Sequence, residues 1–184
     1  MGARSSSRYA NAARDSDGNV HHTLAETESA VAERLDGMVV DVDSMAVVQN
    51  IYRAANTIRN HLEQTVLAPH DLTWTGWVVL WVVWIWGDIE TRHVAIEAGI
   101  SKGTLTGVIG TLEKRDLLLR RVHPDDARRV LVTLTPRGRT LMTTLFPIFN
   151  AAEARVTAAL GAREKRDLAT SLRAVVAQVD ELSP

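Results

Sequence analysis

The stretch from Thr91 to Thr135 decides the fold: TRHVAIEAGISKGTLTGVIGTLEKRDLLLRRVHPDDARRVLVTLT. Its apolar residues recur first at a helical spacing and later at the alternating spacing of strands. Gly99 lies where one helix has to turn into the next. The pattern predicts a short helix, a tight turn, a second helix and a β-hairpin with a charged tip.

The first half of this stretch has the residue types that a helix-turn-helix requires. Ala95 is small enough for two helices to approach closely, and Gly99 can adopt the positive φ of the turn. Leu105 and Val108 are apolar and can hold the second helix against the first. Ser101 is a suitable N-cap for that second helix, which we expect to run to about residue 117.

The outward face of the second helix is expected to be short, polar and rich in glycine. Such residues let a helix sink into the major groove of DNA, where threonine can bond a base edge or contact a thymine methyl group. We therefore predict DNA contacts from Ser101, Lys102, Gly103, Thr104, Thr106 and Gly107. The residues expected to face inward are Leu105, Val108, Ile109 and Leu112.

The second half reads as two strands, residues 118–122 and 130–135, on either side of a charged segment, 123–129. Two arginines at the tip of this hairpin, Arg128 and Arg129, could enter a minor groove, where negative potential is strongest. Surface salt bridges with neighbouring aspartates are the alternative role. We expect Asp126 to bond Arg128 and to support this wing for DNA binding.

Basic residues concentrate in this part of the chain. Between Thr91 and Arg139, ten Lys or Arg side chains stand against five Asp or Glu, a local charge of +5 in a chain whose net charge is −1. The remaining residues therefore carry −6. A protein that presents one surface to a polyanion is expected to separate its charges in this way. A solvated basic surface without a partner would have the same composition.

The segments before this stretch divide into an extension, 1–41, and a predicted dimerisation helix, 42–70. The extension is polar and is expected to be flexible, with a weak capping box at Thr23 and Glu26 before a short helix over residues 24–35. His21 and His22 are expected to face solvent. In the next segment apolar residues recur at a helical spacing from an N-cap at Asp43 or Ser44 to Pro69.

A tryptophan-rich helix begins the predicted DNA-binding domain, residues 71–135. Thr73 is expected to cap it and Gly87 to end it. Four of its five tryptophans share one stripe because they recur in steps of three and four residues: Trp74, Trp77, Trp81 and Trp84. A bulky core explains this stripe, and so does one wall of a pocket for a flat ligand.

The candidate ligand residues are two of these tryptophans, Trp77 and Trp81, together with Arg59 and His61. An aromatic wall beside a cation suits an aromatic carboxylate. The effector expected from these residues is a small aromatic molecule.

Residues 136–184 are predicted to form C-terminal dimerisation helices. Thr135 and Pro136 have the order of an N-cap followed by a proline in the first turn. That helix is expected to reach Gly161, with a bend at Pro147. The final helix has a seam of apolar residues at steps of four and three, which suggests pairing with a partner helix: Leu168, Leu172, Val175, Val179 and Leu182.

These features together resemble the MarR family of bacterial transcription regulators. The resemblance covers roughly residues 42–182. It is carried by Leu72-Thr73 and Trp77, by Leu112-Glu113-Lys114-Arg115 before Asp116-Leu117, and by Asp126-Ala127-Arg128 before Leu134-Thr135-Pro136-Arg137-Gly138. Three features depart from the family: Asp116, where the family usually has glycine, the first 40 residues, which have no counterpart, and the tryptophan-rich helix, which is heavier than usual. No ligand residues are therefore carried over from the family.

The resemblance implies a mainly helical protein with a small β-wing, joined as a homodimer through its N- and C-terminal helices. It also implies binding to a palindromic operator in double-stranded DNA and, commonly, release by small phenolic ligands.

Other functions leave no signature. The chain has no Gly-rich phosphate loop, no His-Glu-x-x-His motif and no Gly-x-Ser-x-Gly elbow, so an enzyme is disfavoured. No metal site or cofactor is expected, because His93 and Glu97 are a lone pair and cysteine is absent. The longest apolar run, residues 77–86, is too short to span a bilayer. We expect a cytoplasmic protein without membrane contact. A winged helix that binds protein remains the main alternative.

Overall fold

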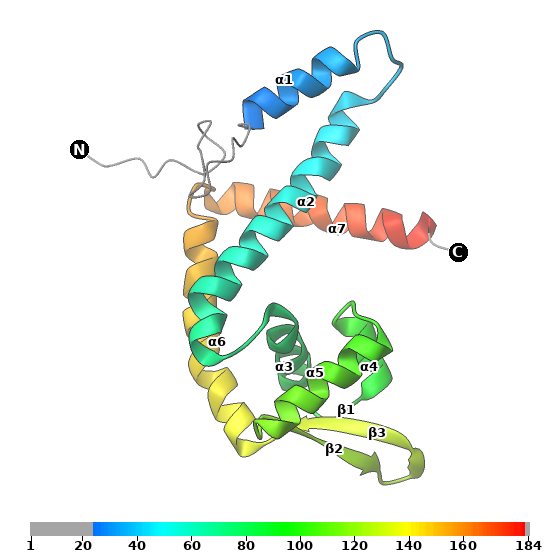
Figure 1. Ribbon diagram of the computed structural model, residues 1–184, viewed down its shortest axis with the longest axis vertical. Helices are drawn as coiled ribbons and strands as arrows, with labels where there is room; N and C mark the ends of the chain where they lie inside the picture. Colours follow the sequence, from blue (N-terminus) through cyan, green and yellow to red (C-terminus); the bar gives the residue numbers. More distant parts are fainter. Residues whose placement is uncertain (1–23, 183–184) are drawn as a thin grey trace, which may run out of the picture. The chain divides into compact units, whose positions relative to one another are not determined.

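The structure is a computed structural model that describes residues 24–182. The chain forms two compact units, one with residues up to Ile51 and the other with residues from Tyr52 onward. Figure 1 labels the elements of both. The predicted tail residues His21, His22 and Thr23 lie outside the described part. The structure confirms a mainly helical chain with a small antiparallel sheet.

The first unit contains α1 (Leu24–Arg34) and the beginning of α2 (Val42–Leu62). The predicted short helix is therefore present. The cap of α2 differs from the prediction, because Asp41 and not Asp43 or Ser44 fills this role. Its Oδ1 accepts a hydrogen bond from the Ser44 amide at 2.9 Å, and its Oδ2 accepts one from the Ser44 hydroxyl at 2.6 Å. These bonds lower the pKa of Asp41.

In the second unit, the chain leaves α2 through a π-helical turn, Glu63–Leu67, and a 3-10 turn, Ala68–His70. The predicted single helix thus changes its winding before the proline that was expected to end it. Asp71 follows in the left-handed conformation with φ of 53°. This residue redirects the chain into the next helix.

Helix α3 (Trp74–Trp86) is the centre of the core. Thr73 caps it by accepting a hydrogen bond from the Gly76 amide at 3.1 Å, and Gly87 ends it with φ of 72°. Both predictions are confirmed. The helix is apolar on nearly every side, and residues from α5, the sheet and α6 pack around it. Its buried residues are Gly76, Trp77, Val79, Leu80, Val82 and Val83.

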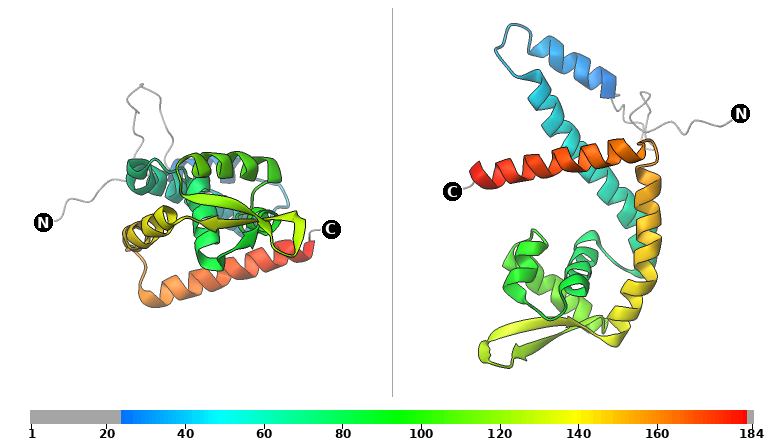
Figure 2. Two further views of the ribbon diagram at one scale, coloured as in Figure 1. Left: turned by 90° about the horizontal axis from the view of Figure 1, so that it is seen from below. Right: turned by 180° about the vertical axis from the view of Figure 1, so that it is seen from behind.

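The chain then forms β1 (Ile89–Glu90), α4 (Thr91–Glu97), α5 (Lys102–Lys114), β2 (Leu118–His123) and β3 (Asp126–Leu134). The sheet is antiparallel with the order β1-β3-β2, so β3 lies between the other two strands. In Figures 1 and 2 the β2–β3 hairpin extends beyond the helices of the domain. This arrangement is a winged helix-turn-helix.

Helix α6 (Pro136–Val156) starts directly after the last strand, β3, in the chain. The hydroxyl of Thr135 accepts from the Gly138 amide at 3.0 Å and donates to the Asp116 carbonyl at 2.6 Å. The Thr135 amide donates to the Leu117 carbonyl at 3.2 Å. The start of α6 is therefore fastened to the chain between α5 and β2. The helix continues through Pro147, and Met142, Leu145, Phe149 and Ala152 face the core.

Helix α7 (Ala162–Leu182) has no buried residue. Its predicted apolar seam lies exposed, including Leu168, Leu172, Val175 and Leu182. Along residues 24–182, no helix combines the length and apolar character needed to cross a bilayer.

Candidate nucleic-acid interface

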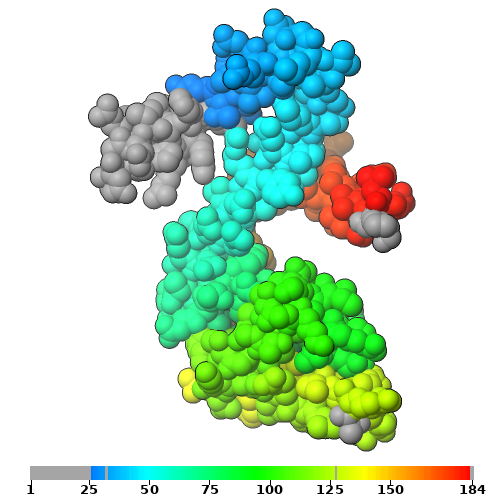
Figure 3. All heavy atoms as spheres, turned by 45° about the vertical axis from the view of Figure 1, so that its right-hand side comes forward, coloured from blue at the N-terminus to red at the C-terminus, as the bar shows by residue number. Residues whose placement is uncertain are grey.

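Helix α5 divides its side chains as the sequence predicts. Leu105, Ile109 and Leu112 are buried, and Val108 is partly buried against the same core. All six predicted contact residues are exposed: Ser101, Lys102, Gly103, Thr104, Thr106 and Gly107. In the space-filling view, α5 and the wing belong to one continuous packed surface (Figure 3). The exposed face of α5 is free of large apolar side chains, as entry into a groove requires.

The hydroxyls on this face are pre-oriented by local hydrogen bonds. Ser101 caps α5 by accepting from the Thr104 amide at 3.1 Å, and the two hydroxyl oxygens lie 2.9 Å apart. The Thr106 hydroxyl donates to the Lys102 carbonyl at 2.9 Å. Because its proton is used within the helix, the Thr106 oxygen is presented to solvent as an acceptor. It can therefore accept a hydrogen bond from the amino group of a base.

The turn between α4 and α5 has the expected geometry. Gly99 adopts φ of 61°, which an L residue rarely tolerates, and the Ile100 amide donates to the Ala95 carbonyl at 3.0 Å. Ala95 is partly buried against the core. The two helices of the motif are thus held by the residues on which the sequence prediction depended.

The tip of the wing is smaller than predicted. The segment 123–129 was expected to be a loop, but His123 pairs with Asp126, so the turn contains only Pro124 and Asp125. Arg128 and Arg129 therefore lie on β3. The register shifts beside His123. Val122 pairs with Val130 and His123 with Asp126, so residues 127–129 lie outside the regular pairing of the two strands.

The two wing arginines have different surroundings. The side chain of Arg128 is 91% exposed. Its Nε donates to Asp126 Oδ1 at 3.1 Å, and its amide donates to the same oxygen at 3.0 Å. The predicted bond between Asp126 and Arg128 is therefore present. The bonds from Arg128 lower the pKa of Asp126.

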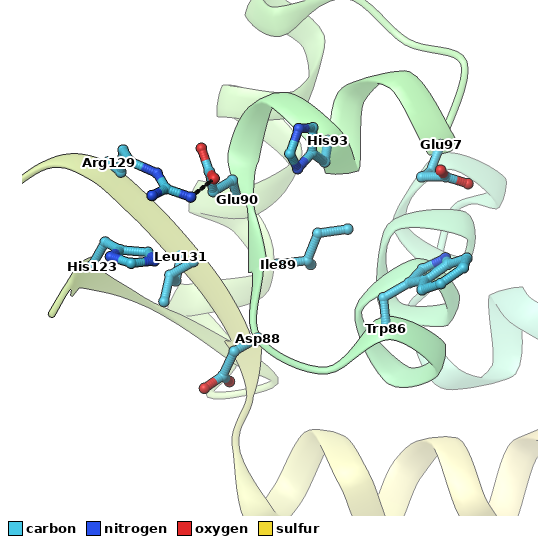
Figure 4. A pocket seen from close by; sticks show the side chains of 9 residues that line it. All are labelled: Trp86, Asp88, Ile89, Glu90, His93, Glu97, His123, Arg129 and Leu131. Carbon is cyan, nitrogen blue, oxygen red and sulfur yellow. Dashed lines mark hydrogen bonds and ion pairs between the residues drawn. The ribbon is translucent and has the colours of Figure 1, made fainter. Parts of the chain in front are cut away.

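Arg129 points from β3 toward Glu90 and donates to its Oε1 through Nη2 (Figure 4). Arg92 Nε lies 3.0 Å from the other oxygen of Glu90, whose side chain is only 8% exposed. One buried carboxylate thus joins the wing to the first helix of the motif. The hydrogen bond from Arg129 is the main cause of the lowered pKa of Glu90. Burial opposes this effect.

Two further ion pairs attach the wing, and the sequence prediction missed them. Arg120 on β2 forms a bidentate pair with Glu113 on α5, at 3.1 and 2.6 Å. Arg121 on the same strand pairs with Asp88, just before β1. The sequence Asp88-Ile89-Glu90 after Gly87 could have indicated one of these pairs. In a short strand, its two carboxylates would lie on the same face and could pair with cations.

The predicted ligand residues are not brought together. Trp77 and Trp81 line a cleft of about 340 Å³ together with Trp74, Val78, Phe146, Phe149 and Glu153. Arg59 and His61 are exposed on α2 and do not line it. The sequence grouped them by charge, which does not determine on which side of α2 a residue lies. The cation expected beside the tryptophans is therefore missing from this cleft.

A second cavity, of about 360 Å³, lies where α4 meets the wing, and His93, Glu97 and His123 are among its lining residues (Figure 4). Within the described range, no group of three or more His, Asp or Glu side chains is arranged to hold a metal ion.

Comparison with known proteins identifies the family. The MarR family model matches residues 72–130, which span α3, the helix-turn-helix and most of the wing. A regulator of the helix-turn-helix type from Bacillus subtilis, YwaE, is 32% identical over 158 residues, or 84% of this chain and 92% of the relative. The chain belongs to the MarR family. It is a DNA-binding transcriptional regulator.

Solved structures of MarR regulators share this fold. BpsR of Bordetella bronchiseptica is 30% identical with a TM-score of 0.66, over 71% of this chain and 98% of that one. Its structure concerns regulation of DNA binding by 6-hydroxynicotinic acid. An E. coli MarR variant complexed with operator DNA has a TM-score of 0.67 at 22% identity, over 72% of this chain and 95% of that one. The latter likeness concerns the fold alone.

One departure from the usual MarR pattern has a visible geometry. Asp116, where the family usually has glycine, adopts φ of 54° between α5 and β2. Aspartate tolerates this left-handed conformation better than most side chains do. The departure from the MarR pattern therefore leaves the turn intact.

Proposed function

We propose that this MarR regulator binds a palindromic operator as a homodimer, with α5 in the major groove and Arg128 in the flanking minor groove. The observation that carries the proposal is the contrast between the two wing arginines. Arg129 is held by a buried carboxylate within the fold, whereas Arg128 is almost fully exposed and is oriented by Asp126. An oriented, exposed arginine suits a narrow minor groove.

The face of α5 supports the major-groove assignment. Thr104 and Thr106 are the side chains with hydroxyls for base edges, whereas Lys102 suits a phosphate. Substituting either threonine should alter sequence preference more than substituting Lys102. Lys102→Ala should instead weaken binding to all sequences and reduce its salt dependence.

The exposed seam of α7 supports the homodimer. Four of its large apolar residues, Leu168, Leu172, Val175 and Leu182, are each more than a third exposed. A contiguous apolar stripe of this kind commonly marks a protein interface. Two-fold symmetry would then place the operator half-sites about one helical turn apart, roughly 10 bp.

A response to a small ligand is part of the proposal. The tryptophan cleft between α3 and α6 supports it, as does the ligand named for BpsR. A ligand would act by binding more tightly to a form of the dimer whose lobes do not match the operator spacing.

Binding to the DNA upstream of the protein's own gene tests the proposal against a winged helix that binds protein. A gel shift repeated over a range of salt should give affinity that falls steeply as salt rises. Footprinting should protect two symmetric half-sites. The absence of any DNA binding at low salt would favour the protein-binding alternative.

A further inference from the structure

The tryptophan cleft is formed by matching stripes on two helices. Trp74, Trp77, Val78 and Trp81 recur along α3 at steps of three, one and three residues, and Phe146, Phe149 and Glu153 recur along α6 at steps of three and four. Each set therefore occupies one face of its helix. The rings of Trp77 and Phe149 stack with centroids 4.6 Å apart, and Trp74 lies 6.1 Å from Phe149.

The cleft presents aromatic surface as well as packing it. Trp77 is buried, but Trp81 is 40% exposed and Trp74 is partly exposed. The volume of about 340 Å³ lies at the lower end of the range for small-molecule sites. The cleft thus fits a molecule with one aromatic ring and a compact substituent.

Its charge is negative. Among the seven lining residues, Glu153 is the only charged one. Its Oε2 accepts a hydrogen bond from Asn150 Nδ2 at 3.0 Å, which orients the carboxylate without neutralising it. Within residues 24–182, no Lys, Arg or His forms an ion pair with Glu153. An aromatic carboxylate in this cleft would face a like charge and find no cation.

Two features of the cleft favour a cation instead. The faces of tryptophan rings carry negative quadrupole potential and attract ammonium groups, with tryptophan the strongest of the aromatic side chains. The Glu153 carboxylate adds an opposite charge at the side of the same cleft. Aromatic walls are the surfaces by which proteins commonly recognise quaternary ammonium groups.

We propose that the cleft between α3 and α6 binds a small aromatic organic cation, such as an aryl quaternary ammonium, with Glu153 and Trp81 determining its preference for positive charge. Only the effect of this ligand on DNA binding rests on the proposed function. Binding of the cation to the cleft does not depend on it. This ligand class is opposite in charge to the aromatic carboxylate expected from the sequence.

Titration calorimetry on the full chain tests the proposal with two probes of similar size, benzyltrimethylammonium and phenylacetate. The ammonium should bind and phenylacetate should bind more weakly or not at all. Glu153→Gln should weaken binding of the ammonium by about two- to fivefold, the range of a partly exposed ion pair. Trp81→Leu, which keeps an apolar side chain but removes the ring, should weaken it by a similar factor.

The matched control is Glu181→Gln, which removes the same charge from exposed α7 and should leave the affinity for the ammonium unchanged. Phenylacetate binding more tightly than the ammonium would overturn the proposal, as would equal affinity of the ammonium for the wild-type chain and Glu153→Gln. No binding of either probe would also overturn it. A gel shift without ligand is measured in parallel, so that loss of the ligand site and loss of DNA binding are recorded separately.

Discussion

Among the glycines that the structure describes, Gly138 has the closest contact for an added Cβ atom. A Cβ atom built at this position would lie 1.8 Å from the carbonyl oxygen of Leu117, a backbone atom that cannot rotate away. The close approach follows from the bonds that fasten Thr135 to Asp116 and Leu117. We predict that Gly138→Ala lowers the free energy of unfolding by on the order of 2 kcal/mol, as overpacking does. Urea denaturation measures this change.

Gly110 provides the control for that measurement. It also lies inside a helix, α5, but a Cβ there meets no atom within 4 Å. Because glycine is a poor helix former, Gly110→Ala should raise the free energy of unfolding by about 0.5–1 kcal/mol. A loss of stability at Gly110 as large as that at Gly138 would show that the Leu117 contact is not the cause.

Asp116 allows a second prediction at this scale. Its φ of 54° costs an ordinary L residue roughly 1–2 kcal/mol, whereas glycine adopts it freely. The Asp116→Gly variant should therefore be more stable than Asp116→Ala by about 1 kcal/mol. It should have the higher midpoint in both thermal and urea unfolding. Equal stability of the two variants would mean that the turn relaxes to a negative φ when its side chain changes.

Local sequence signals, such as helix caps and turn glycines, predicted a large part of the secondary structure. Thr73, Gly87, Gly99 and Ser101 act within four residues of their own positions, so their roles could be predicted from spacing alone. Glu90 and Arg129 are 39 residues apart, and their pairing depends on where β1 meets β3. The sequence contains both charges but does not specify which arginine the carboxylate will meet.

The sequence predicted the wing as a β-hairpin but did not predict where its strands begin and end. The strands were expected to end where the charged residues begin, because charges are typical of loops. In the structure β3 extends back to Asp126, which pairs with His123 of β2, and Arg129 of β3 forms an ion pair with Glu90 of β1. Charges that are paired across a sheet no longer favour a loop.

The Glu90 carboxylate should make the stability of the wing depend on pH. Its pKa is held below the ordinary glutamate range, chiefly by the hydrogen bond from Arg129. A group whose pKa is lowered by folding stabilises the folded state above its unfolded pKa, and this contribution is lost as pH falls through the folded pKa. The contribution is therefore complete at neutral pH and disappears in acid.

We predict that Glu90→Gln lowers the thermal midpoint most at neutral pH, and that the difference from the wild type narrows as pH falls. Differential scanning calorimetry from about pH 7 to about pH 3 crosses the ordinary pKa of glutamate, below which the contribution of the carboxylate begins to be lost. A difference that stays constant over this range would mean that the variant acts through packing and not through charge.

In the proposed homodimer, operator binding depends on the pairing of two winged helix-turn-helix domains. Leu172 lies in the middle of the exposed seam of α7. Replacing it with lysine would bury a charge in the proposed interface, so Leu172→Lys should shift the protein toward monomer in sedimentation velocity. Since a monomer contacts only one half-site, operator affinity should fall on the order of 10²-fold.

The matched variant is Thr170→Lys, which adds the same charge to the opposite face of α7. It should remain dimeric and retain its operator affinity. If the Leu172→Lys variant stays dimeric and keeps its full operator affinity, α7 does not form the dimer interface. Another surface would then have to join the two DNA-binding domains.

The central claim is that α5 and Arg128 read DNA together, and fluorescence anisotropy with the operator at several salt concentrations tests it most directly. Arg128→Ala should cost about 1–3 kcal/mol of binding free energy and flatten the salt dependence. Arg163→Ala, which removes the same charge from α7, should change neither. If Arg128→Ala binds the operator with the affinity and salt dependence of the wild type, the wing does not read DNA.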